Sequence, residues 1–507
     1  SMENNKITPE ILLITLALSI GSFMNVLDST IVNVSLSHIA GDFGISPNQG
    51  TWVITSYSVA EAIFLPLIGW LTTRFGSVKQ YIWSTILFTI ASMICGLAPT
   101  YPLLLFARVM QGVVGASMIP LSQTIMLSVY PKAKKGLGLG IWAMTIVIAP
   151  VLGPILGGWI TDTMSWRWCF YVNLPFGILS SYLVYTAFKK RGHKDIIQHS
   201  KIDFIGLILL IIGVGSLQLM LDKGSELDWF SSSTVVFLAI MAFVFLVVLV
   251  IWEFYQKNPI VNVRLFLNRN FVAGSVSLMV ASVVFVGGIV IIPLWLQNSM
   301  GYTSFTSGQT TATSGILVIF LAPIIGANIH KFDARKLTVF GFVTFSIISI
   351  GLSQYSTDTT QGYIALTRFL TGGALAFFFL PLNTITLSEI DDKDMTSASG
   401  LYNFMRNIGN SVGVSLSVSL WQNKIAEHHE ILTSNITTSN PIYMNYLNKI
   451  PNGTPANTAS LFDGLISQQA VVMAVNDVMQ VSGIIILLLI PFIFLAKKPS
   501  KAVAMGH

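Results

Sequence analysis

Charged side chains interrupt several long apolar segments of the 507-residue chain. Asp28, Glu61 and Arg108 lie inside three of these segments, and Arg406 lies inside a fourth. A charged side chain at the centre of a bilayer costs about 2.5–3.5 kcal/mol on insertion scales, so its presence there indicates a function. The chemistry open to such residues is the uptake and release of a proton, or contact with a charged ligand.

Asp28 and Arg108 form the first candidate pair. Asp28 lies in the outer half of the first apolar segment, and Arg108 lies five residues from the outside end of the fourth. Because these segments cross the membrane in opposite directions, the two side chains can meet at a similar depth. This placement favours a proton-titrating carboxylate whose pKa is set by burial and by the guanidinium. A permanent structural ion pair is the alternative.

Glu61 and Arg406 each allow more than one role. Glu61 lies near the middle of the second segment, with no basic residue within one helical turn. It carries a proton, contacts a cationic substrate, or faces a wet cavity as a bystander, and these alternatives stay open. Arg406 either orients polar groups in a cavity or pairs across the bundle. Asp477, close to the outside end of the last segment, is interpreted as solvated.

Small residues and prolines mark two further candidate sites. The fifth segment predicts a kinked, tightly packed helix that gates between two halves, with simple small-residue packing as the alternative. The turn after the second segment predicts a latch on the inside face, with a topology signal alone as the alternative. The gating residues are Gly153, Pro154, Gly157 and Gly158, and the latch residues are Gly69, Arg74, Gly76 and Lys79.

The elements that position these residues are predicted to be membrane-spanning helices. The chain is 53% hydrophobic and only 10% charged, whereas soluble domains carry roughly a quarter charged residues. This composition excludes a disordered chain and argues against a soluble enzyme. Fourteen runs are long enough to cross a bilayer, and they are continuous rather than alternating, which excludes barrel strands. These runs are 11–34, 51–72, 81–98, 103–128, 137–161, 168–188, 203–221, 234–254, 271–298, 307–329, 336–354, 361–386, 396–420 and 475–496.

The basic residues predict the orientation. If the N-terminus is inside, 21 of the 28 Lys and Arg residues fall in inside segments and 4 in outside segments. This bias supports an even number of spans with both termini cytoplasmic. The net charge of +6 therefore indicates the cytoplasmic leaflet and not nucleic acid.

The linkers predict three units: a six-helix bundle at 1–190, two linker helices at 191–270, and a second six-helix bundle at 271–507. The bundles share a motif, because Arg108 and Arg368 each precede a glycine by four residues and a proline further on. Such internal repeats are typical of transporters that bind substrate at the repeat interface. The outside segment 421–474 is interpreted as a solvated loop with an amphipathic stretch, or as a docking surface for a periplasmic partner.

The sequence lacks patterns for other chemistry. No GxxxxGK[ST] motif is present, so the chain itself carries no ATP-driven motor. Cys95 and Cys169 lie in or beside apolar runs and indicate neither a disulfide framework nor a metal site. The chain is therefore predicted to be neither an enzyme nor a metal or cofactor protein.

Several of these segments together resemble the major facilitator superfamily, and within it the fourteen-helix drug:proton antiporters. Residues 49–56, 216–222 and 228–230 further resemble the EmrB-type multidrug exporters. The resemblance covers essentially the whole chain, and the ordered set is more specific than any one motif. The segments that match the antiporters are 27–34, Arg108-x-x-Gln111-Gly112, Gly153-Pro154 with Gly157-Gly158, and 166–177.

The resemblance implies export of hydrophobic or amphipathic drugs in exchange for protons across a bacterial inner membrane. It also implies a periplasmic EmrA-like adaptor and a TolC-like outer-membrane channel. Two residues depart from the family pattern: Thr73 stands where an aspartate usually precedes Arg74, and Glu61 replaces a neutral residue. A dedicated exporter or importer of one metabolite, such as a siderophore or sugar, is the alternative function. A non-transporting membrane subunit is disfavoured by the buried charges.

Overall fold

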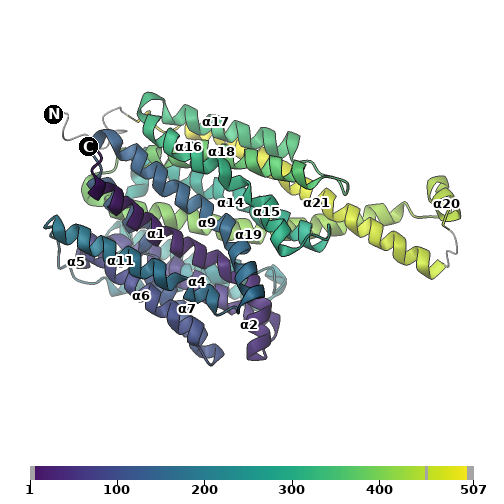
Figure 1. Cartoon of the computed structure of the whole chain (residues 1–507), viewed down its shortest axis with the longest axis horizontal. Coiled ribbons are helices and arrows are strands. Elements are labelled where there is room, and N and C mark those ends of the chain that lie inside the picture. Colours follow the sequence, from purple (N-terminus) through teal and green to yellow (C-terminus); the bar gives the residue numbers. More distant parts are fainter. Residues whose placement is uncertain (1–5, 451–454, 500–507) are drawn as a thin grey trace.

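The apolar runs form long helices that pack side by side (Figure 1). The computed structural model describes residues 6–450 and 455–499, and all regular elements in these ranges are helical. The first group of long helices is α1 (Pro9–Ile31), α4 (Trp52–Phe64) with α5 (Ile68–Phe75), α6 (Ser77–Leu97), α7 (Tyr101–Gly115) with α8 (Met118–Val129), α9 (Lys135–Thr163) and α11 (Asn173–Lys190). Short helices α2 (Leu36–Phe43), α3 (Pro47–Gly50) and α10 (Trp168–Tyr171) lie between them.

The rest of the chain continues this pattern with longer helices. The pair α12 (Phe204–Lys223) and α13 (Ser233–Phe254) pack on each other, and α12 also contacts α4 and α19. The remaining elements are α14 (Arg269–Asn298), α15 (Ser304–Ala312), α16 (Ser314–Asn328), α17 (Ala334–Ile347), α18 (Gln361–Leu387), α19 (Met395–Ser434), α20 (Pro441–Asn448) and α21 (Pro455–Ile493).

Local sequence sets where several helices begin. The Thr8 hydroxyl accepts from the backbone N–H of Ile11, and Pro9 occupies the first helical position of α1. Asn268 and Thr360 cap α14 and α18 in the same way. Such caps satisfy backbone donors that have no partner inside the helix. The helix starts are thus readable from neighbouring residues alone.

Twelve helices among the described residues are long and apolar enough to cross a membrane, rather than the fourteen expected. The expected spans 168–188 and 396–420 correspond to α11 and α19, which fall outside this group. α11 has only 18 residues and ends in two lysines, while α19 carries polar residues such as Asn403, Arg406 and Asn407. The mean hydropathy of each helix is therefore too low to identify it as a membrane span. The count of fourteen spans stays a prediction.

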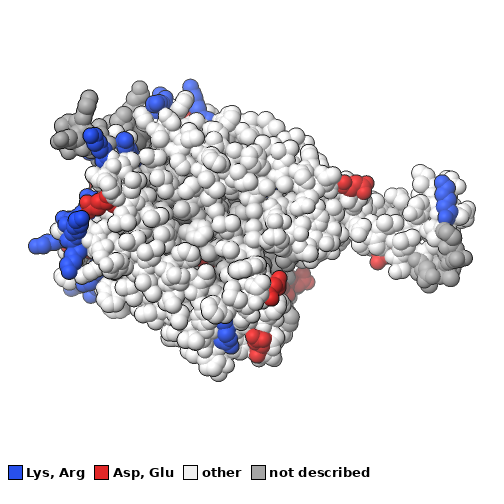
Figure 2. Space-filling view, viewed as in Figure 1, with Lys and Arg blue, Asp and Glu red and all other residues white. Residues whose placement is uncertain are grey.

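Charge divides the molecule into two ends and a middle. Figure 2 shows most visible Lys and Arg side chains at the end where α1 begins, hereafter the basic end. Almost no charged side chain appears over the middle of this face (Figure 2). Large apolar side chains such as Trp83, Phe106 and Phe243 are exposed on the outer helix surfaces. This distribution is that of a protein whose middle lies in lipid.

Two groups of helices pack mainly among themselves. In the first, α1 contacts α9 and α11, while α4 and α6 contact α7. In the second, α14 contacts α19 and α21, and α18 contacts α16 and α17. The first group, formed before residue 191, and the second, formed after residue 268, are called the two halves below. The division into domains at residues 190 and 270 stays a prediction.

Glycines bring the two halves together near the basic end. A Cβ on Gly140 of α9 would lie 2.5 Å from the carbonyl oxygen of Ala322 in α16. Gly136 of α9 and Gly326 of α16 are similarly close to each other's carbonyl oxygens. Small residues four apart allow this approach of two helix backbones. The Gly136-x-x-x-Gly140 spacing in the sequence is the local signal for this close crossing.

The segment 421–474, expected as an outside loop with an amphipathic stretch, is mostly helical in the described residues, and its location outside the membrane stays a prediction. α19 runs unbroken to Ser434, and α21 begins at Pro455, while residues 451–454 lie outside the described residues. The two helices project beyond the bundle as a hairpin with α20 near its tip (Figure 1). His428 pairs with Asp477 at 2.6 Å, so Asp477 is not simply solvated. No Gly or Pro occurs from residue 414 to 434, so nothing in the sequence ends α19 at the membrane.

Gly140→Leu should destabilise the protein because the new side chain would push α9 away from α16. Overpacking of this kind costs roughly 1–3 kcal/mol. The matched control is Gly362→Leu, since Gly362 of α18 has open space around it. The midpoint of thermal unfolding of the purified protein in detergent micelles should fall for Gly140→Leu and not for the control. Equal midpoints would contradict the close crossing.

Candidate functional site

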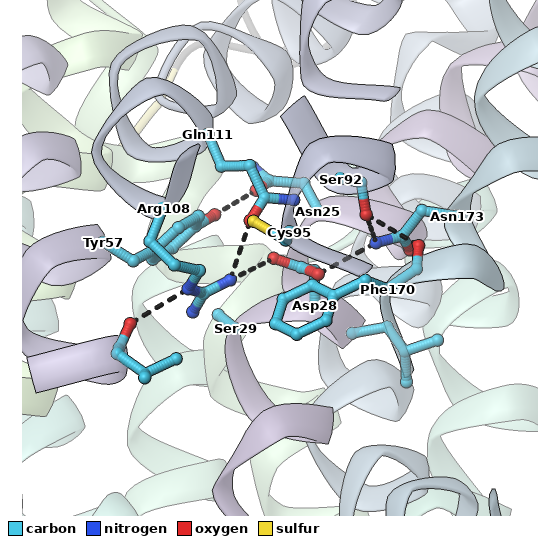
Figure 3. Close-up of polar contacts among 12 residues, drawn as sticks. Asn25, Asp28, Ser29, Tyr57, Ser92, Cys95, Arg108, Gln111, Phe170 and Asn173 are labelled. Atoms are coloured by element: carbon cyan, nitrogen blue, oxygen red, sulfur yellow. Dashed lines mark hydrogen bonds and ion pairs between the residues drawn. The ribbon is translucent and has the colours of Figure 1, made fainter. Parts of the chain in front are cut away.

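Asp28 and Arg108 meet in a fully buried ion pair between α1 and α7. The distance from Arg108 Nη1 to Asp28 Oδ2 is 2.8 Å, and both side chains have zero exposure. The same nitrogen donates to Gln111 Oε1 at 3.0 Å, and Arg108 Nε donates to the carbonyl oxygen of Val53 at 2.9 Å (Figure 3). The prediction that these two charges lie at one depth is confirmed.

The other carboxylate oxygen of Asp28 also has a partner. Asn173 Nδ2 of α11 donates to Asp28 Oδ1 at 2.8 Å and contacts the Ser92 hydroxyl of α6 at 2.9 Å (Figure 3). The Arg108 guanidinium lies 4.5 Å from the ring centre of Tyr57 in α4. Five helices therefore contribute to one polar cluster. Charge-assisted hydrogen bonds of this kind are the strongest in proteins.

This geometry links protonation to packing. A proton on Asp28 would remove the charge that attracts Arg108 and would convert one acceptor oxygen into a donor. Either the Arg108 contact or the Asn173 contact would then have to change. Since these partners lie on different helices, a change in the charge of Asp28 would shift the balance between helix arrangements.

Glu61 and Arg406, separate in the sequence analysis, approach each other across the two halves. Asn407 Nδ2 of α19 donates to Glu61 Oε1 of α4 at 2.7 Å. Arg406 precedes Asn407 on α19, so its charge lies on the helix that contacts Glu61. Glu61 has no basic neighbour on its own helix, so only tertiary packing supplies this one. Pairing of Arg406 across the bundle, one of the predicted alternatives, stays a prediction, because no carboxylate lies within 4.0 Å of its guanidinium in the described part of the chain. The role of Glu61 stays open.

A second polar contact between the halves was not predicted. Gln123 Nε2 of α8 donates to Asn383 Oδ1 of α18 at 3.0 Å, and the Ser399 hydroxyl of α19 donates to Gln123 Oε1 at 2.6 Å. All three side chains are buried. Gln123 and Asn383 follow the prolines of the repeated motif, which was the available signal.

The small residues and prolines of α9 contact α1 in the same half and line a pocket shared with the second half. A Cβ on Gly153 would lie 2.8 Å from Cβ of Thr30, so Gly153 packs on α1 within its own half. Gly157 is buried and Gly158 is half-buried, and a gating role for either stays a prediction. Pro150 and Pro154 line a small pocket whose other walls come from the second half.

The predicted latch contains a carboxylate that the sequence analysis missed. Asp195, from the segment after α11, accepts the backbone N–H groups of Val78 and Lys79 at 3.3 and 3.1 Å. Asp195 Cγ would lie 2.5 Å from a Cβ on Gly76, which also has a φ of +85°. Thr73 takes the usual aspartate position, and Asp195 brings a carboxylate to the start of α6. The negative charge there complements the helix N-terminus.

The rest of the latch reaches the second half and the linker segment. A Cβ on Gly69 of α5 would lie 2.8 Å from Cα of Ser397 in α19, so the two helices touch here. Arg74 Nη1 donates to the carbonyl oxygen of Ser200 at 3.3 Å. The Lys79 side chain is exposed, and its contribution to these contacts is its backbone N–H. Latching itself stays a prediction.

The fold and this buried cluster define a multi-pass membrane transporter. No group of three or more potential metal ligands lies together in the described part of the chain. The family model of the Major Facilitator Superfamily matches residues 18–414. The proton:xylose symporter XylE, bound to 6-bromo-6-deoxy-D-glucose, shares the fold with a TM-score of 0.60, at 14% identity over 98% of each chain.

Relatives with similar sequences show which group of transporters within the superfamily the chain belongs to. The chain is 40% identical to the multidrug export protein EmrB of Escherichia coli (strain K12), over 97% of this chain and 96% of the relative. It is 42% identical to the multidrug export protein EmrB of Haemophilus influenzae, over 96% of each chain. The chain therefore belongs to the Major Facilitator Superfamily and, within it, to the EmrB-type multidrug exporters.

Asp195→Ala should weaken the start of α6 by about 1 kcal/mol, the usual loss for a helix cap. The control is Lys194→Ala, since Lys194 is exposed beside Asp195. Hydrogen–deuterium exchange at residues 77–80 should rise in Asp195→Ala alone. The same exchange rate in both variants would show that the contact adds nothing.

Arg108→Gln should destabilise the protein more than the double variant Arg108→Gln/Asp28→Asn. The single variant leaves a buried carboxylate without its counter-ion, which costs about 3–5 kcal/mol, whereas the double variant removes both charges. Thermal unfolding in micelles, with both variants measured beside the native protein, tests this order. A double variant that unfolds at or below the temperature of the single one would refute it.

Proposed function

We propose that this multidrug exporter is a proton-coupled antiporter in which Asp28 binds the coupling proton. The observation that carries the proposal is the Asp28 cluster, in which each carboxylate oxygen has a partner on another helix. A carboxylate held in this way by neighbouring helices ties its charge to their arrangement. The coupling ion is the proton, and no other cofactor is needed.

Transport proceeds by alternating access of the two halves. The crossing of α9 and α16 and the contact of Gly69 with Ser397 join the halves near the basic end. The pocket beside Pro150 and Pro154 lies between them, away from that end. To open the basic end, α9 and α16 would have to move apart at their glycine crossing while the pocket closes. The contacts at Glu61 and Gln123 lie between these regions and would change with them.

Fourteen spans with both termini cytoplasmic remain our topology for this inner-membrane protein. α11 and α19 are included because each packs against long apolar helices, α11 against α1 and α6, and α19 against α14 and α21. Their polar faces would then serve the bundle interior rather than lipid. The basic end is cytoplasmic in this scheme, as the positive-inside rule requires.

The helical hairpin of α19, α20 and α21 then projects on the outer side of the membrane. We propose it as the place where a periplasmic EmrA-like adaptor, itself joined to a TolC-like channel, would contact the exporter. The support is its projection beyond the bundle (Figure 1) together with the kinship to EmrB-type proteins.

Asp28→Asn should abolish drug efflux driven by a pH gradient in proteoliposomes, because the amide cannot exchange a proton. It should keep drug counterflow, which needs substrate binding and helix rearrangement but no net proton movement. Asp222→Asn is the control, since Asp222 lies in α12 and bonds with Gln218, outside the Asp28 cluster. Substantial pH-driven efflux by Asp28→Asn would contradict the assignment.

A further inference from the structure

Arg368 is a buried cation without an acidic partner. It lies in α18 with 5% of its surface exposed and forms part of the pocket wall beside Pro150 and Pro154. Among residues 6–450 and 455–499, no carboxylate lies within 4.0 Å of its guanidinium, and its Nε has no hydrogen-bond partner. The Tyr355 side chain, a neutral group, is its neighbour. Burial of an uncompensated charge is unfavourable, so the site is incomplete as it stands.

The internal repeat shows what is missing. Arg368 occupies in the second half the place of Arg108 in the first, and Arg108 is neutralised by Asp28. Asp28 is the twentieth residue of α1, and the twentieth residue of α14 is Gly288. A Cβ on Gly288 would lie 3.0 Å from Arg368 Nη1. A glycine therefore stands where the first half has the carboxylate, directly against the guanidinium.

The surroundings of Arg368 suit one kind of ligand. Ser307 of α15 lines the same pocket, is fully buried, and has a hydroxyl that finds no hydrogen-bond partner among the described residues. Within the described part of the chain, two unsatisfied polar groups thus line one pocket. The remaining wall is largely apolar, with contributions from Pro154, Ile289 and Pro293. A molecule with an anionic head and an apolar body would satisfy both parts.

We propose that this pocket binds the carboxylate of amphipathic acids, with Arg368 as the counter-ion and Ser307 as a hydrogen-bond donor. The absence of a side chain at Gly288 leaves the guanidinium accessible to the ligand. The proposal rests on the proposed export function, and it names a substrate class and the residues that recognise it. Arginine is suited to this task because its planar donors match the two oxygens of a carboxylate.

Two probes with equal chains and opposite head groups test the proposal: decanoate and decyltrimethylammonium. Binding is measured by calorimetry on the full chain in nanodiscs of phosphatidylcholine, a lipid without net charge. Arg368→Gln should weaken decanoate binding by at least about tenfold while leaving the cation within about threefold, because only the anion loses a charged partner. Arg368→Lys keeps the charge and should keep most decanoate binding, which separates charge from folding.

Gly288 provides a matched pair of variants. Gly288→Asp supplies the carboxylate that the first half has at Asp28, so it should neutralise Arg368 and reproduce the loss of decanoate binding. Gly288→Asn has nearly the same size without the charge and should bind decanoate more tightly than Gly288→Asp. Equal effects of the two Gly288 variants, or parallel changes for both probes in Arg368→Gln, would overturn the proposal. So would a native protein that does not bind decanoate.

A flux measurement keeps this inference separate from the proposed antiport. If Arg368→Gln still exports a lipophilic cation under a pH gradient, the proposed antiport is supported regardless of the result for decanoate binding. If the native protein shows no proton-driven flux but binds decanoate through Arg368, antiport fails and the anion site stands.

Discussion

The cost of burying a charge governs the organisation of this transporter. Within the apolar middle of the bundle, Asp28 pairs with Arg108, and Asn173, Gln111 and the Val53 carbonyl add hydrogen bonds to the pair. Among the described residues, only Arg108 Nη2 of the two charged groups has no hydrogen-bond partner. Removing water strengthens each of these contacts and raises the penalty for losing any of them. Helices α1, α4, α6, α7 and α11 are therefore tied to one ionisable group. A charge that moves on or off that group acts on all of them.

The two halves meet through different kinds of contact at different depths. Near the basic end, Gly136, Gly140 and Gly326 allow backbone-to-backbone packing that depends on shape. Deeper in the bundle, Glu61 with Asn407 and Gln123 with Asn383 join the halves through hydrogen bonds. Beyond these lies the pocket that includes Arg368. Shape-dependent and polar contacts of this kind can be broken and remade without exposing a large apolar core to water.

Both halves carry the arginine of the repeated motif, but within the described residues only the arginine of the first half pairs with a carboxylate. Arg108 has a carboxylate within its own half, whereas Arg368 faces a pocket with Gly288 where the acid would be. In the mechanism that we propose, the first half holds the ion-coupling group and the second half contacts the substrate.

The sequence alone determined the membrane class, the helix runs and the candidate charges, because hydropathy and charge cost are properties of contiguous residues. It placed Asp28 and Arg108 at one depth for the same reason, since helix direction and rise convert sequence position into depth. Hydropathy did not identify α11 or α19 as spans, because α11 is short and ends in two lysines and α19 carries polar residues that lower its average. The continuation of α19 beyond the bundle could have been predicted from the sequence, because residues 414–434 contain no Gly or Pro. Only the tertiary structure brought Asn407 to Glu61, Asp195 to α6 and Gly288 to Arg368, because contacts between helices far apart in the chain leave no local pattern.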